Sequence, residues 1–326
     1  MLCLHNEGLD ADFNLAAEEY LLTTLREPAF MVWRNHPAVI IGRNQNPYRE
    51  ANSRELESRG VPILRRISGG GAVYHDTGNI NFTVLTPAPG APRIDYQTPL
   101  KPILRFLRSM GLQARFDGGN GLALNGKKIS GNAQHIHKQM ILHHGTLLFD
   151  TDLEALTRTL AAGPPGKYQD RGVNSVRQPV ANLRPLLARD FTVMEFMTQL
   201  IKAIQSQRNG RRARFSDADL QAIEALAAAR YRSWEWNFGR TPDYRLVNAV
   251  CGDKIRVEIQ MQVCAGRIRR IEVGGAKLSG LFAQSLDDRL KGCRHLRQDV
   301  AAALMKVDWE TAPAGVTRSH FTEALF

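Results

Sequence analysis

Residues 65–76 combine two arginines, three consecutive glycines and a polar tail, in the order Arg-Arg-Ile-Ser-Gly-Gly-Gly-Ala-Val-Tyr-His-Asp. Glycines leave backbone N–H groups open, so phosphate or carboxylate oxygens can approach where side chains would block them. Arg65 and Arg66 can add charge-assisted hydrogen bonds. The spacing differs from G-x-G-x-x-G, so the dinucleotide-binding fingerprint is absent. The run predicts an anion-binding loop, and a flexible turn is the alternative.

Residues 121–128 nearly match a phosphate-binding P-loop, but the last position is Lys instead of Ser or Thr. The hydroxyl that would hold magnesium is missing and the next segment predicts a strand, so we reject a P-loop. Asn125-Gly126 is typical of a tight hairpin turn. Neighbouring strand residues point to opposite faces, so only one of Lys127 and Lys128 should face a ligand. Two solvated lysines on a turn are the alternative.

Four of the nine histidines lie close together, at His135, His137, His143 and His144. An H-x-H pair on a strand puts both rings on one face, which is a spacing that zinc can use. The sequence nearby offers no acidic or cysteine ligand. Structural or surface histidines are therefore the main interpretation, with substrate contact by His144 and metal binding as alternatives.

Ser68, His75 and Asp76 are close in sequence and raise the question of a nucleophilic serine. Such a serine usually lies in a G-x-S-x-G elbow between a strand and a helix. That motif is absent, which argues against serine catalysis.

Hydrophobic periodicity predicts the elements that would position these residues. Helices are expected over 13–26, 47–59, 99–110, 275–290 and 295–306. Capping boxes predict further helix starts at Thr151 with Glu154, Thr192 with Glu195, and Ser216 with Asp219. Strands are expected at Phe30–Trp33 and Val39–Ile41 (as a hairpin), Val61–Arg66, Asn79–Thr86, Leu122–Leu124, Lys127–Ile129, Leu142–Phe149, Ile255–Val263 and Ile268–Val273.

This order of elements differs from the regular alternation of a doubly wound sheet. We expect an α/β fold with a mixed, largely antiparallel sheet and helices. The pattern pauses around Asn237–Tyr244, where Gly239 and Pro242 lie. We therefore expect a large domain over 1–244 and a small α+β domain over 245–326.

The 326-residue chain is 43% hydrophobic and 23% charged, as is usual for a globular protein. Its formal net charge of +11 suggests an acidic partner, which could be nucleic acid, an acidic protein or a nucleotide. We expect neither a membrane-spanning helix nor a signal peptide. The four cysteines form no C-x-x-C pair, so a cytoplasmic location is expected.

Six motifs, taken together and in this order, resemble the lipoate–protein ligase family. They are GRNQNPYRE at 42–50, RRISGGGAVYHDTGN at 65–79, KKISGNA at 127–133, HHGTLL at 143–148, NSVRQPVANL at 174–183 and SWEWNFGRTP at 233–242. The resemblance implies a fold like that of class II biotin and lipoate ligases. It also implies two half-reactions: lipoate and ATP give lipoyl-AMP and pyrophosphate, and a carrier lysine then attacks the mixed anhydride.

The resemblance also implies partners and cofactors. The expected carriers are the apo lipoyl domains of 2-oxoacid dehydrogenase E2 subunits and of the glycine-cleavage H protein, bound by a monomeric enzyme that engages neither nucleic acid nor a membrane. ATP and Mg²⁺ are the expected cofactors, with lipoate as the substrate. The positive charge suits carrier domains that are commonly acidic.

Residue roles follow by matching positions to the family's motifs. Lys128, directly before Ile-Ser-Gly, matches the essential lysine, which is expected to stabilise charge on the acyl carbonyl and α-phosphate in the transition state. Gly166–Val180 matches a loop that closes over the adenylate. The adenylate is expected to contact Arg66, Gly71, Ala72, Val73, Tyr74, Asn79 and Lys128. Lipoate is expected to contact Trp33, Ser68, Gly70, Lys128, His135 and His144, and no metal ligand is assigned.

Three positions depart from the family's pattern. Gly121 follows Asn120 where the family often has Asp, an expected magnesium ligand. His135 and Pro179 stand where many members have arginine. All three changes affect the adenylation side, so a lipoyltransferase that accepts ready-made lipoyl-AMP is the main alternative.

Other classes of protein fit less well. A biotin ligase has a different Gly-rich motif, and a thioester-forming transferase needs a catalytic cysteine, whereas the sequence has none between residues 4 and 250. A basic nucleic-acid-binding protein would be expected to carry an aromatic RNP motif, a zinc finger or a helix-turn-helix, and none is present. A carrier-binding protein without turnover stays an alternative.

Overall fold

The computed structural model describes residues 1–88, 93–160, 163–164, 166–251, 256–275 and 278–326, and divides into two compact units. The first unit comprises Met1–Arg43, Gly60–Leu160 and Asn174–Ser233. The second comprises Asn44–Arg59, Trp234–Phe326 and the described part of 161–173. Within the described ranges, helices that combine the length and the apolar character needed to cross a bilayer are absent. The expected division at residue 244 stays a prediction.

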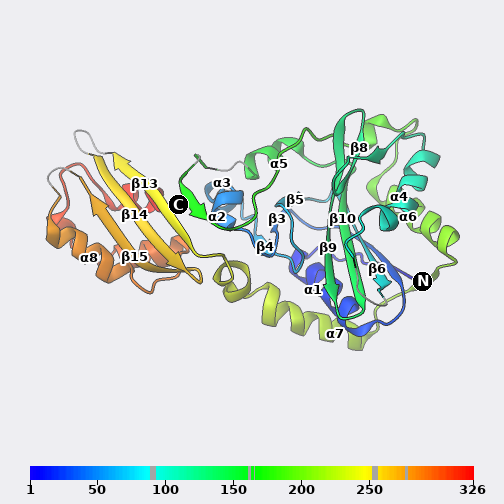
Figure 1. Ribbon diagram of the computed structural model, residues 1–326, viewed down its shortest axis with the longest axis horizontal. Coiled ribbons are helices and arrows are strands. Elements are labelled where there is room, and N and C mark those ends of the chain that lie inside the picture. Colours follow the sequence, from blue (N-terminus) through cyan, green and yellow to red (C-terminus); the bar gives the residue numbers. More distant parts are fainter. Residues whose placement is uncertain (89–92, 161–162, 165, 252–255, 276–277) are drawn as a thin grey trace. The chain divides into compact units, whose positions relative to one another are not determined.

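An eight-stranded sheet organises the first unit (Figure 1). Its strand order is β12 (Arg211–Ala213), β1 (Leu2–His5), β2 (Ala29–Trp33), β6 (Asn79–Pro87), β10 (Met140–Leu148), β9 (Lys127–His137), β8 (Gly121–Leu124) and β7 (Arg115–Phe116). The pairings of β1 with β12 and with β2 are parallel, and the other pairings are antiparallel. The expected mixed, largely antiparallel sheet is confirmed.

Strand β6 shows how the sequence assigns the two faces of this sheet. Its residues alternate between apolar and polar, as a strand with two different faces requires. The apolar residues enter the hydrophobic core: Ile80, Phe82 and Val84. The polar residues point to the opposite face, yet they too are buried: Asn79, Asn81 and Thr83. Because buried polar groups need partners or a ligand, this second face is where a binding site is expected.

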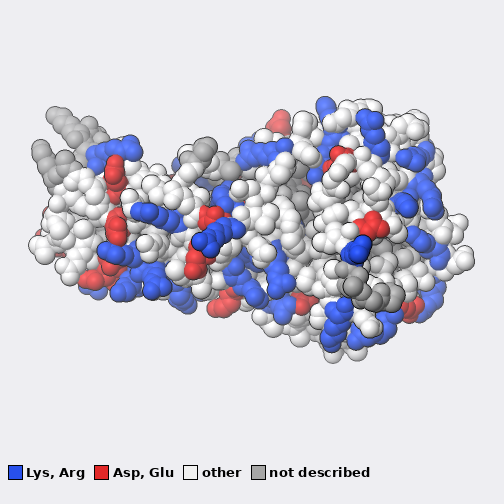
Figure 2. Space-filling view, viewed as in Figure 1, with Lys and Arg blue, Asp and Glu red and all other residues white. Residues whose placement is uncertain are grey.

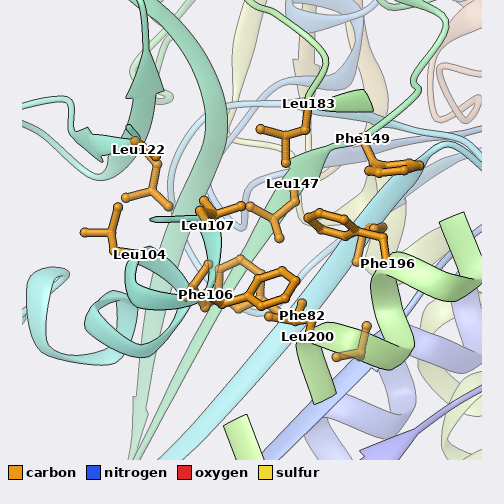
Figure 3. Packing of buried hydrophobic residues seen from close by; sticks show 14 of the residues in the cluster. Phe82, Leu104, Phe106, Leu107, Leu122, Leu147, Phe149, Leu183, Phe196 and Leu200 are labelled. Atoms are coloured by element: carbon orange, nitrogen blue, oxygen red, sulfur yellow. The ribbon is translucent and has the colours of Figure 1, made fainter. Parts of the chain in front are cut away.

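Helices α4 (Gln97–Ser109) and α6 (Val193–Arg208) cover the apolar face. Figure 3 shows Phe82 and Leu147 of the sheet with Leu104 and Leu107 of α4 and Phe196 and Leu200 of α6. The ring of Phe196 lies 5.1 Å from Phe106 and 4.8 Å from Phe149. Burying one such aromatic side chain stabilises the fold by roughly 1.5–3 kcal/mol. This layer makes the sheet a rigid support for its polar face.

A second, three-stranded sheet has the order β4 (Ile63–Arg65), β3 (Ala38–Ile41) and β5 (Val73–His75). The expected hairpin between Phe30–Trp33 and Val39–Ile41 is therefore wrong, because β2 belongs to the large sheet and β3 to this one. Both strands are completely buried, so each needs neighbours on both edges. Strand β3 finds them in β4 and β5, which flank the glycine-rich run.

The remaining elements of the first unit differ in detail from the expected ones. They are α1 (Ala11–Thr24), α5 (Leu153–Thr159), α7 (Asp217–Leu226) and the short turns η1 (Arg184–Leu186) and η2 (Ala227–Tyr231). The capping boxes of Thr192 and Ser216 are confirmed. The box expected at Thr151 is wrong, because Asp152 caps α5 by accepting a hydrogen bond from the N–H of Ala155.

The second unit is built on a sheet with the order β11 (Tyr168–Asp170), β13 (Tyr244–Cys251), β14 (Arg256–Cys264) and β15 (Arg267–Gly274). Its helical elements are α2 (Pro47–Glu50), α3 (Ser53–Ser58), η3 (Glu235–Gly239), α8 (Gly280–Leu290), α9 (Arg297–Leu304), η4 (Trp309–Thr311) and α10 (Arg318–Ala324). The expected α+β character is confirmed. Sequence analysis missed β13 and α10. The expected strand start at Ile255 and residues 276–277 of an expected helix lie outside the described residues.

Two earlier segments join this unit through specific contacts. The expected single helix over 47–59 is divided into α2 and α3, because Asn52 caps α3 with its side chain. Arg49 of α2 contacts Asp170 of β11 at 2.6 Å. Tyr48 stacks on Tyr168 and donates a hydrogen bond to the carbonyl of His295. The segment expected as one closing loop at 166–180 therefore contains a strand, β11.

Candidate active site

The glycine-rich run forms a loop between β4 and β5 that is organised around the guanidinium of Arg66. Its Nη2 donates to the carbonyls of Gly69 at 2.6 Å and Gly71 at 2.7 Å. Nη1 donates to the carbonyl of Ile40 at 3.1 Å, and Nε donates to Oγ of Ser68 at 3.0 Å. Burial lowers the pKa of Arg66 to about 10, so it stays charged at neutral pH. Arg66 thus sets the shape of the loop, whereas its contact with an adenylate stays a prediction.

Gly70 is the position where this loop requires glycine. Its φ of +90° lies in the left-handed region, which side chains disfavour. A Cβ there would also lie 3.0 Å from Nη2 of Arg66. A side chain at position 70 would therefore displace Arg66, and the hydrogen bonds that Arg66 donates to the loop carbonyls would be lost.

A buried hydrogen-bonded chain leads from this loop to helix α1. Oγ of Ser68 lies 2.6 Å from Nε2 of His144, which belongs to β10. Nδ1 of the same ring lies 2.9 Å from each carboxylate oxygen of Glu18, on α1. Ser68, His144 and Glu18 are all buried. The chain joins two residues that the sequence predicted for the lipoate site to a carboxylate that sequence analysis missed.

The chain continues from Glu18 to the third predicted lipoate residue in this group. The hydroxyl of Thr83, on β6, donates to Glu18 at 2.6 Å. Nε1 of Trp33, on β2, donates to the hydroxyl of Thr83 at 3.0 Å. Trp33, Ser68 and His144 are therefore linked through one carboxylate, although 111 residues separate the first from the last. A hydrogen-bonded network of this kind fixes the orientation of each side chain that it contains.

Lys128 and Lys127 have different surroundings at the start of β9, as strand alternation predicted. Lys127 is exposed, whereas the side chain of Lys128 is 23% exposed and its Nζ lies 3.8 Å from Oδ2 of Asp117. The backbone of Lys128 also pairs with the segment 179–181. Its N–H donates to the carbonyl of Pro179 at 2.8 Å, and its carbonyl accepts from Ala181 at 3.0 Å. The lysine is thus fixed at its backbone and paired at its tip.

The same segment reaches the glycine-rich loop through Ser175. The backbone N–H of Ala72, a predicted adenylate contact, donates to Oγ of Ser175 at 2.9 Å. A Cβ at Gly71 would lie 3.0 Å from that same oxygen. The segment 174–181 therefore contacts both the loop and the backbone of Lys128. Sequence analysis expected a closing loop over 166–180 but did not single out Ser175 within it.

Asn79, another predicted adenylate residue, begins β6 in a buried position. Its Nδ2 donates to Asn81 at 2.9 Å, while its Oδ1 has no hydrogen-bond partner among the described residues. Asp76 holds the preceding turn, because its Oδ1 accepts from the N–H of Gly78 and of Asn79. A buried polar atom without a partner is costly in a folded protein. The side chain of Asn79 is therefore suited to accept a ligand's hydrogen bond.

The remaining predicted residues lie at the margins of this group. Val73 and Tyr74 belong to β5 and pair with Ile40 and Val39 of β3. His135, on β9, is half-buried, and its pKa is lowered by burial and by the charge of Arg43. In the ladder between β9 and β10, His144 pairs with Ala133, and His135 lies two residues further along β9. All the predicted site residues belong to the first unit.

The histidine cluster does not form a metal site in the part of the chain that the structure describes. Groups of three or more His, Cys, Asp or Glu side chains able to hold a metal are absent from the described residues. Nδ1 of His143 lies 3.0 Å from Nε2 of Gln134, and burial lowers the pKa of His143 to about 3. His143 is therefore buried and in contact with Gln134, and the interpretation of the cluster as structural or surface histidines stays a prediction. His144 has a different environment, inside the chain that starts at Ser68.

The sequence held only weak signals for the missed residues. Glu18 is a charged residue among the mostly apolar buried residues of α1, and such a residue needs a partner. Thr83 is one of the alternating polar residues of β6. Asp117 lies in a Gly-rich turn outside the six motifs, and nothing in the sequence pairs it with Lys128.

Comparison with known proteins gives consistent matches of three kinds. Residues 10–205 match the model of the lipoyl protein ligase A/B catalytic domain. Lipoate–protein ligase 1 of Staphylococcus aureus is 35% identical over 306 residues, which cover 93% of each chain. Solved structures also match. One comes from a structural analysis of a bipartite lipoate protein ligase and its E2 lipoyl domain from Thermoplasma acidophilum. It has a TM-score of 0.62 and 26% identity over 72% of this chain and 94% of that one.

A structure of lipoate–protein ligase A bound with ATP has a TM-score of 0.60 and 25% identity, over 72% of this chain and 97% of that one. The fold and these matches define a ligase with the mixed α/β architecture of the lipoate ligases. The chain belongs to the lipoyl protein ligase A/B family. The resemblance stated from the six sequence motifs is therefore confirmed.

Proposed function

We propose that this protein uses ATP to activate lipoate as lipoyl-AMP and then attaches the lipoyl group to a lysine of a lipoyl-carrier domain. The family match and the 35% identity to a lipoate–protein ligase support the reaction. The observation that carries the proposal is the buried chain of hydrogen bonds. It joins predicted lipoate residues Trp33, Ser68 and His144 to Arg66, the organiser of the loop expected to bind the adenylate.

The two half-reactions set different demands on the site. In the first, a carboxylate oxygen of lipoate attacks the α-phosphorus of ATP and pyrophosphate leaves. In the second, the neutral amine of the carrier lysine attacks the acyl carbonyl, and AMP leaves with the bonding electrons. Both steps build negative charge next to the acyl and phosphoryl groups. A fixed cation at Lys128 stabilises that charge without reorganisation.

We propose the following division of residues within this site. The adenylate contacts Arg66, Gly71, Ala72, Val73, Tyr74, Asn79 and Lys128. Lipoate contacts Trp33, Ser68, Gly70, Lys128, His135 and His144. Glu18 joins the second set as a positioning residue, because its carboxylate orients His144 from the side opposite Ser68.

Magnesium is part of the proposal only as the companion of the nucleotide. In nucleotide sites Mg²⁺ is commonly held by one or two carboxylates together with the substrate's phosphates. The carboxylate of Asp117 lies beside Lys128 and is within ion-pair distance of it, so we assign no protein ligand to the ion. When bound, the ion would neutralise phosphate charge. Because Gly121 stands where the family often has Asp, the carboxylate beside Lys128 comes from Asp117 and not from position 121.

The carrier is proposed from chemistry and from a relative. The Thermoplasma acidophilum ligase was analysed with its E2 lipoyl domain, and lipoyl domains of E2 subunits or of the glycine-cleavage H protein would serve here. On the face shown in Figure 2, Lys and Arg side chains are spread across the surface with fewer acidic side chains between them. The net charge of +11 would steer an acidic carrier towards the protein.

We further propose that residues 1–244 carry out the reaction and that 245–326 form an accessory domain, since every proposed contact lies in the first compact unit. A monomeric state and a cytoplasmic location belong to the same proposal. All four cysteines are free, in keeping with a role that needs no disulfide.

Lipoate-dependent ATP–pyrophosphate exchange in the presence of magnesium tests the proposal. Exchange with lipoate, and none with biotin, would support a ligase that makes its own adenylate. Modification of an apo lipoyl domain from synthetic lipoyl-AMP, without exchange, would make the protein a lipoyltransferase. Failure of both reactions would overturn the proposed function.

A further inference from the structure

Asp117 lies in the turn between β7 and β8, and its two carboxylate oxygens have different tasks. Oδ1 accepts hydrogen bonds from the backbone N–H of Gly119 at 2.8 Å and of Gly121 at 2.9 Å. The N–H of Asp117 closes the same turn by donating to the carbonyl of Gly121 at 3.1 Å. Oδ2 takes no part in the turn and lies 3.8 Å from Nζ of Lys128. One oxygen is therefore anchored while the other faces the proposed catalytic lysine.

Gly121 provides the space in which this pair forms. A Cβ at position 121 would lie 2.2 Å from Oδ2 of Asp117 and 2.9 Å from Cε of Lys128. It would also lie 2.6 Å from the backbone carbonyl of Ser130. Any side chain at 121 would displace the carboxylate, the lysine stem or the neighbouring strand. The glycine that departs from the family's pattern is thus required by the position of Asp117.

The stem of Lys128 also crosses a second glycine. A Cβ at Gly131 would lie 3.5 Å from Cε of Lys128 and 3.9 Å from Nζ. The lysine therefore runs over two residues without side chains and ends beside a carboxylate. The side chain of Asp117 is only 11% exposed, which limits screening of the pair by water. Among the described residues, Asp117 is the one carboxylate within ion-pair distance of Lys128.

We propose that Asp117 is a positioning residue that holds the ammonium of Lys128 at the reaction centre, in a cradle floored by Gly121 and Gly131. A lysine side chain is a compact charge on a flexible four-carbon stem, so its position must be imposed by its surroundings. The pair imposes one direction on the stem before substrates arrive. This inference rests on the proposed function for its effect on catalysis, but the cradle itself is a property of the free protein.

Asp117→Asn separates the charge of the carboxylate from its role in the turn. Asparagine keeps an oxygen that can accept from Gly119 and Gly121, but it removes the charge that faces Lys128. We expect kcat to fall by about 10- to 100-fold in whichever of the two half-reactions the protein is found to carry out. Such a loss is typical of a misplaced catalytic group. The KM values for ATP and lipoate and the melting temperature should change little. An unchanged kcat overturns the proposal.

Asp95→Asn is the matched control. Asp95 also accepts backbone N–H bonds in a turn, from Gln97 and Thr98, but it has no part in the proposed site. We expect this variant to keep the wild-type kcat. An equal loss in both variants would indicate a general effect of removing a turn carboxylate, and would overturn the proposal.

Magnesium titration distinguishes the lysine from the metal ion as the partner of Asp117. If excess Mg²⁺ restores the kcat of Asp117→Asn, the carboxylate serves the ion and the proposal is wrong. We expect a loss that magnesium does not restore. A double-mutant cycle with Lys128→Ala, read as affinity for an unreactive sulfamoyl analogue of lipoyl-AMP, should be non-additive. Additive losses would mean that Asp117 acts independently of the lysine.

A footprint of lysine reactivity tests the cradle without any activity. In acetic anhydride labelling followed by mass spectrometry, Asp117→Asn should increase labelling of Lys128 relative to that of Lys127. Equal labelling ratios in wild type and variant would overturn the proposal. A changed ratio in a protein that fails both lipoate assays would keep the cradle and refute the proposed function instead.

Discussion

Nδ1 of His144 lies 2.9 Å from each carboxylate oxygen of Glu18. A carboxylate only accepts hydrogen bonds, so Nδ1 of His144 carries a proton, and in the tautomer that has this proton alone the other ring nitrogen keeps its lone pair. Nε2 is then an acceptor, and the hydroxyl of Ser68 donates to it over 2.6 Å. The lone pairs of Ser68 are left for Nε of Arg66, at 3.0 Å. One carboxylate on α1 thus determines the direction of every hydrogen bond up to the glycine-rich loop.

Glu18→Gln should weaken lipoate binding more than nucleotide binding. A glutamine can present either oxygen or nitrogen to His144, so the ring tautomer and the orientation of Ser68 are no longer fixed. We expect the KM for lipoate to rise by about tenfold, as loss of a buried charged hydrogen bond worth roughly 1.5–3 kcal/mol permits. Glu19→Gln is the control. The carboxylate of Glu19 accepts a hydrogen bond from the hydroxyl of Tyr231 at 2.7 Å and takes no part in the hydrogen bonds that join Glu18 to Ser68. A larger rise in KM for Glu19→Gln would contradict the assignment.

Lys128→Ala should abolish transfer of the lipoyl group, while Lys127→Ala should have a mild effect. The two side chains lie on opposite faces of β9, and only Lys128 has a carboxylate partner within 4 Å among the described residues. Loss of a preorganised cation commonly costs about 10²–10³ in kcat. The measurement is single-turnover transfer from synthetic lipoyl-AMP to an apo lipoyl domain. Equal losses in the two variants would refute the choice of lysine.

Ser175→Ala should strengthen ATP binding in the free protein. Oγ of Ser175 accepts the N–H of Ala72, which is one of the groups proposed to bind the adenylate. Because a nucleotide oxygen must replace the hydroxyl, removing it should lower the Kd for ATP by about threefold, within the range of one hydrogen bond. Val176→Ala is the control, since Val176 is 82% exposed in the same segment. Weaker binding by Ser175→Ala, measured calorimetrically, would show that Ser175 contacts the nucleotide.

Buried His75 should make the fold sensitive to acid. Burial, together with the nearby charge of Arg66, lowers its pKa to about 3. Its Nδ1 lies 2.9 Å from Nδ2 of Asn35, which can donate only to a neutral nitrogen. At pH values between about 3 and the ordinary histidine pKa of about 6.5, the unfolded chain binds a proton at this histidine and the folded chain does not. Stability therefore falls with falling pH, by up to about 1.4 kcal/mol per pH unit from this group.

His75→Asn provides the comparison, because an asparagine oxygen can accept from Asn35 without titrating. Denaturant unfolding at several pH values between about 4 and 7 should give a shallower pH dependence for the variant than for the wild type. Parallel curves would mean that the lowered pKa of His75 does not contribute to the pH dependence of stability. His143 and His295 have pKa values lowered to about 3 by burial and should leave the variant with a residual slope.

The association of the protein with an acidic lipoyl domain should depend on salt. The net charge of +11 would raise the encounter rate at low ionic strength. Raising NaCl from about 50 mM to about 300 mM should lower the association rate by about tenfold, with a smaller change in the dissociation rate. Stopped-flow measurements separate the two rates. An association rate that does not change with salt would remove charge steering from the proposal.

The sequence predicted those parts of the site that depend on local backbone chemistry. The hairpin turn is one such part, because Asn125 and Gly126 adopt the positive φ values of 51° and 77° that this dipeptide favours. The alternation in β6 and the capping boxes of α6 and α7 are others. Each depends on residues within a few positions of one another, so the pattern alone contains the physical cause.

Long-range pairing escaped the sequence for an equally physical reason. The apolar runs in β2 and β3 look alike, and a buried strand has no local feature that chooses its neighbours. They were therefore predicted as a hairpin, although they belong to different sheets. Strand β13 was missed because its polar residues and the preceding Gly239 and Pro242 resemble a linker.

The site divides in the same way. The sequence by itself predicted a glycine-rich anion-binding loop and one lysine facing a ligand after a tight turn, and the six motifs identified the family. Only the tertiary structure decided that Glu18 contacts His144, 126 residues away, and that Asp117 faces Lys128. Carboxylates are chosen as partners by distance and burial, and both quantities exist only after the strands and helices have packed.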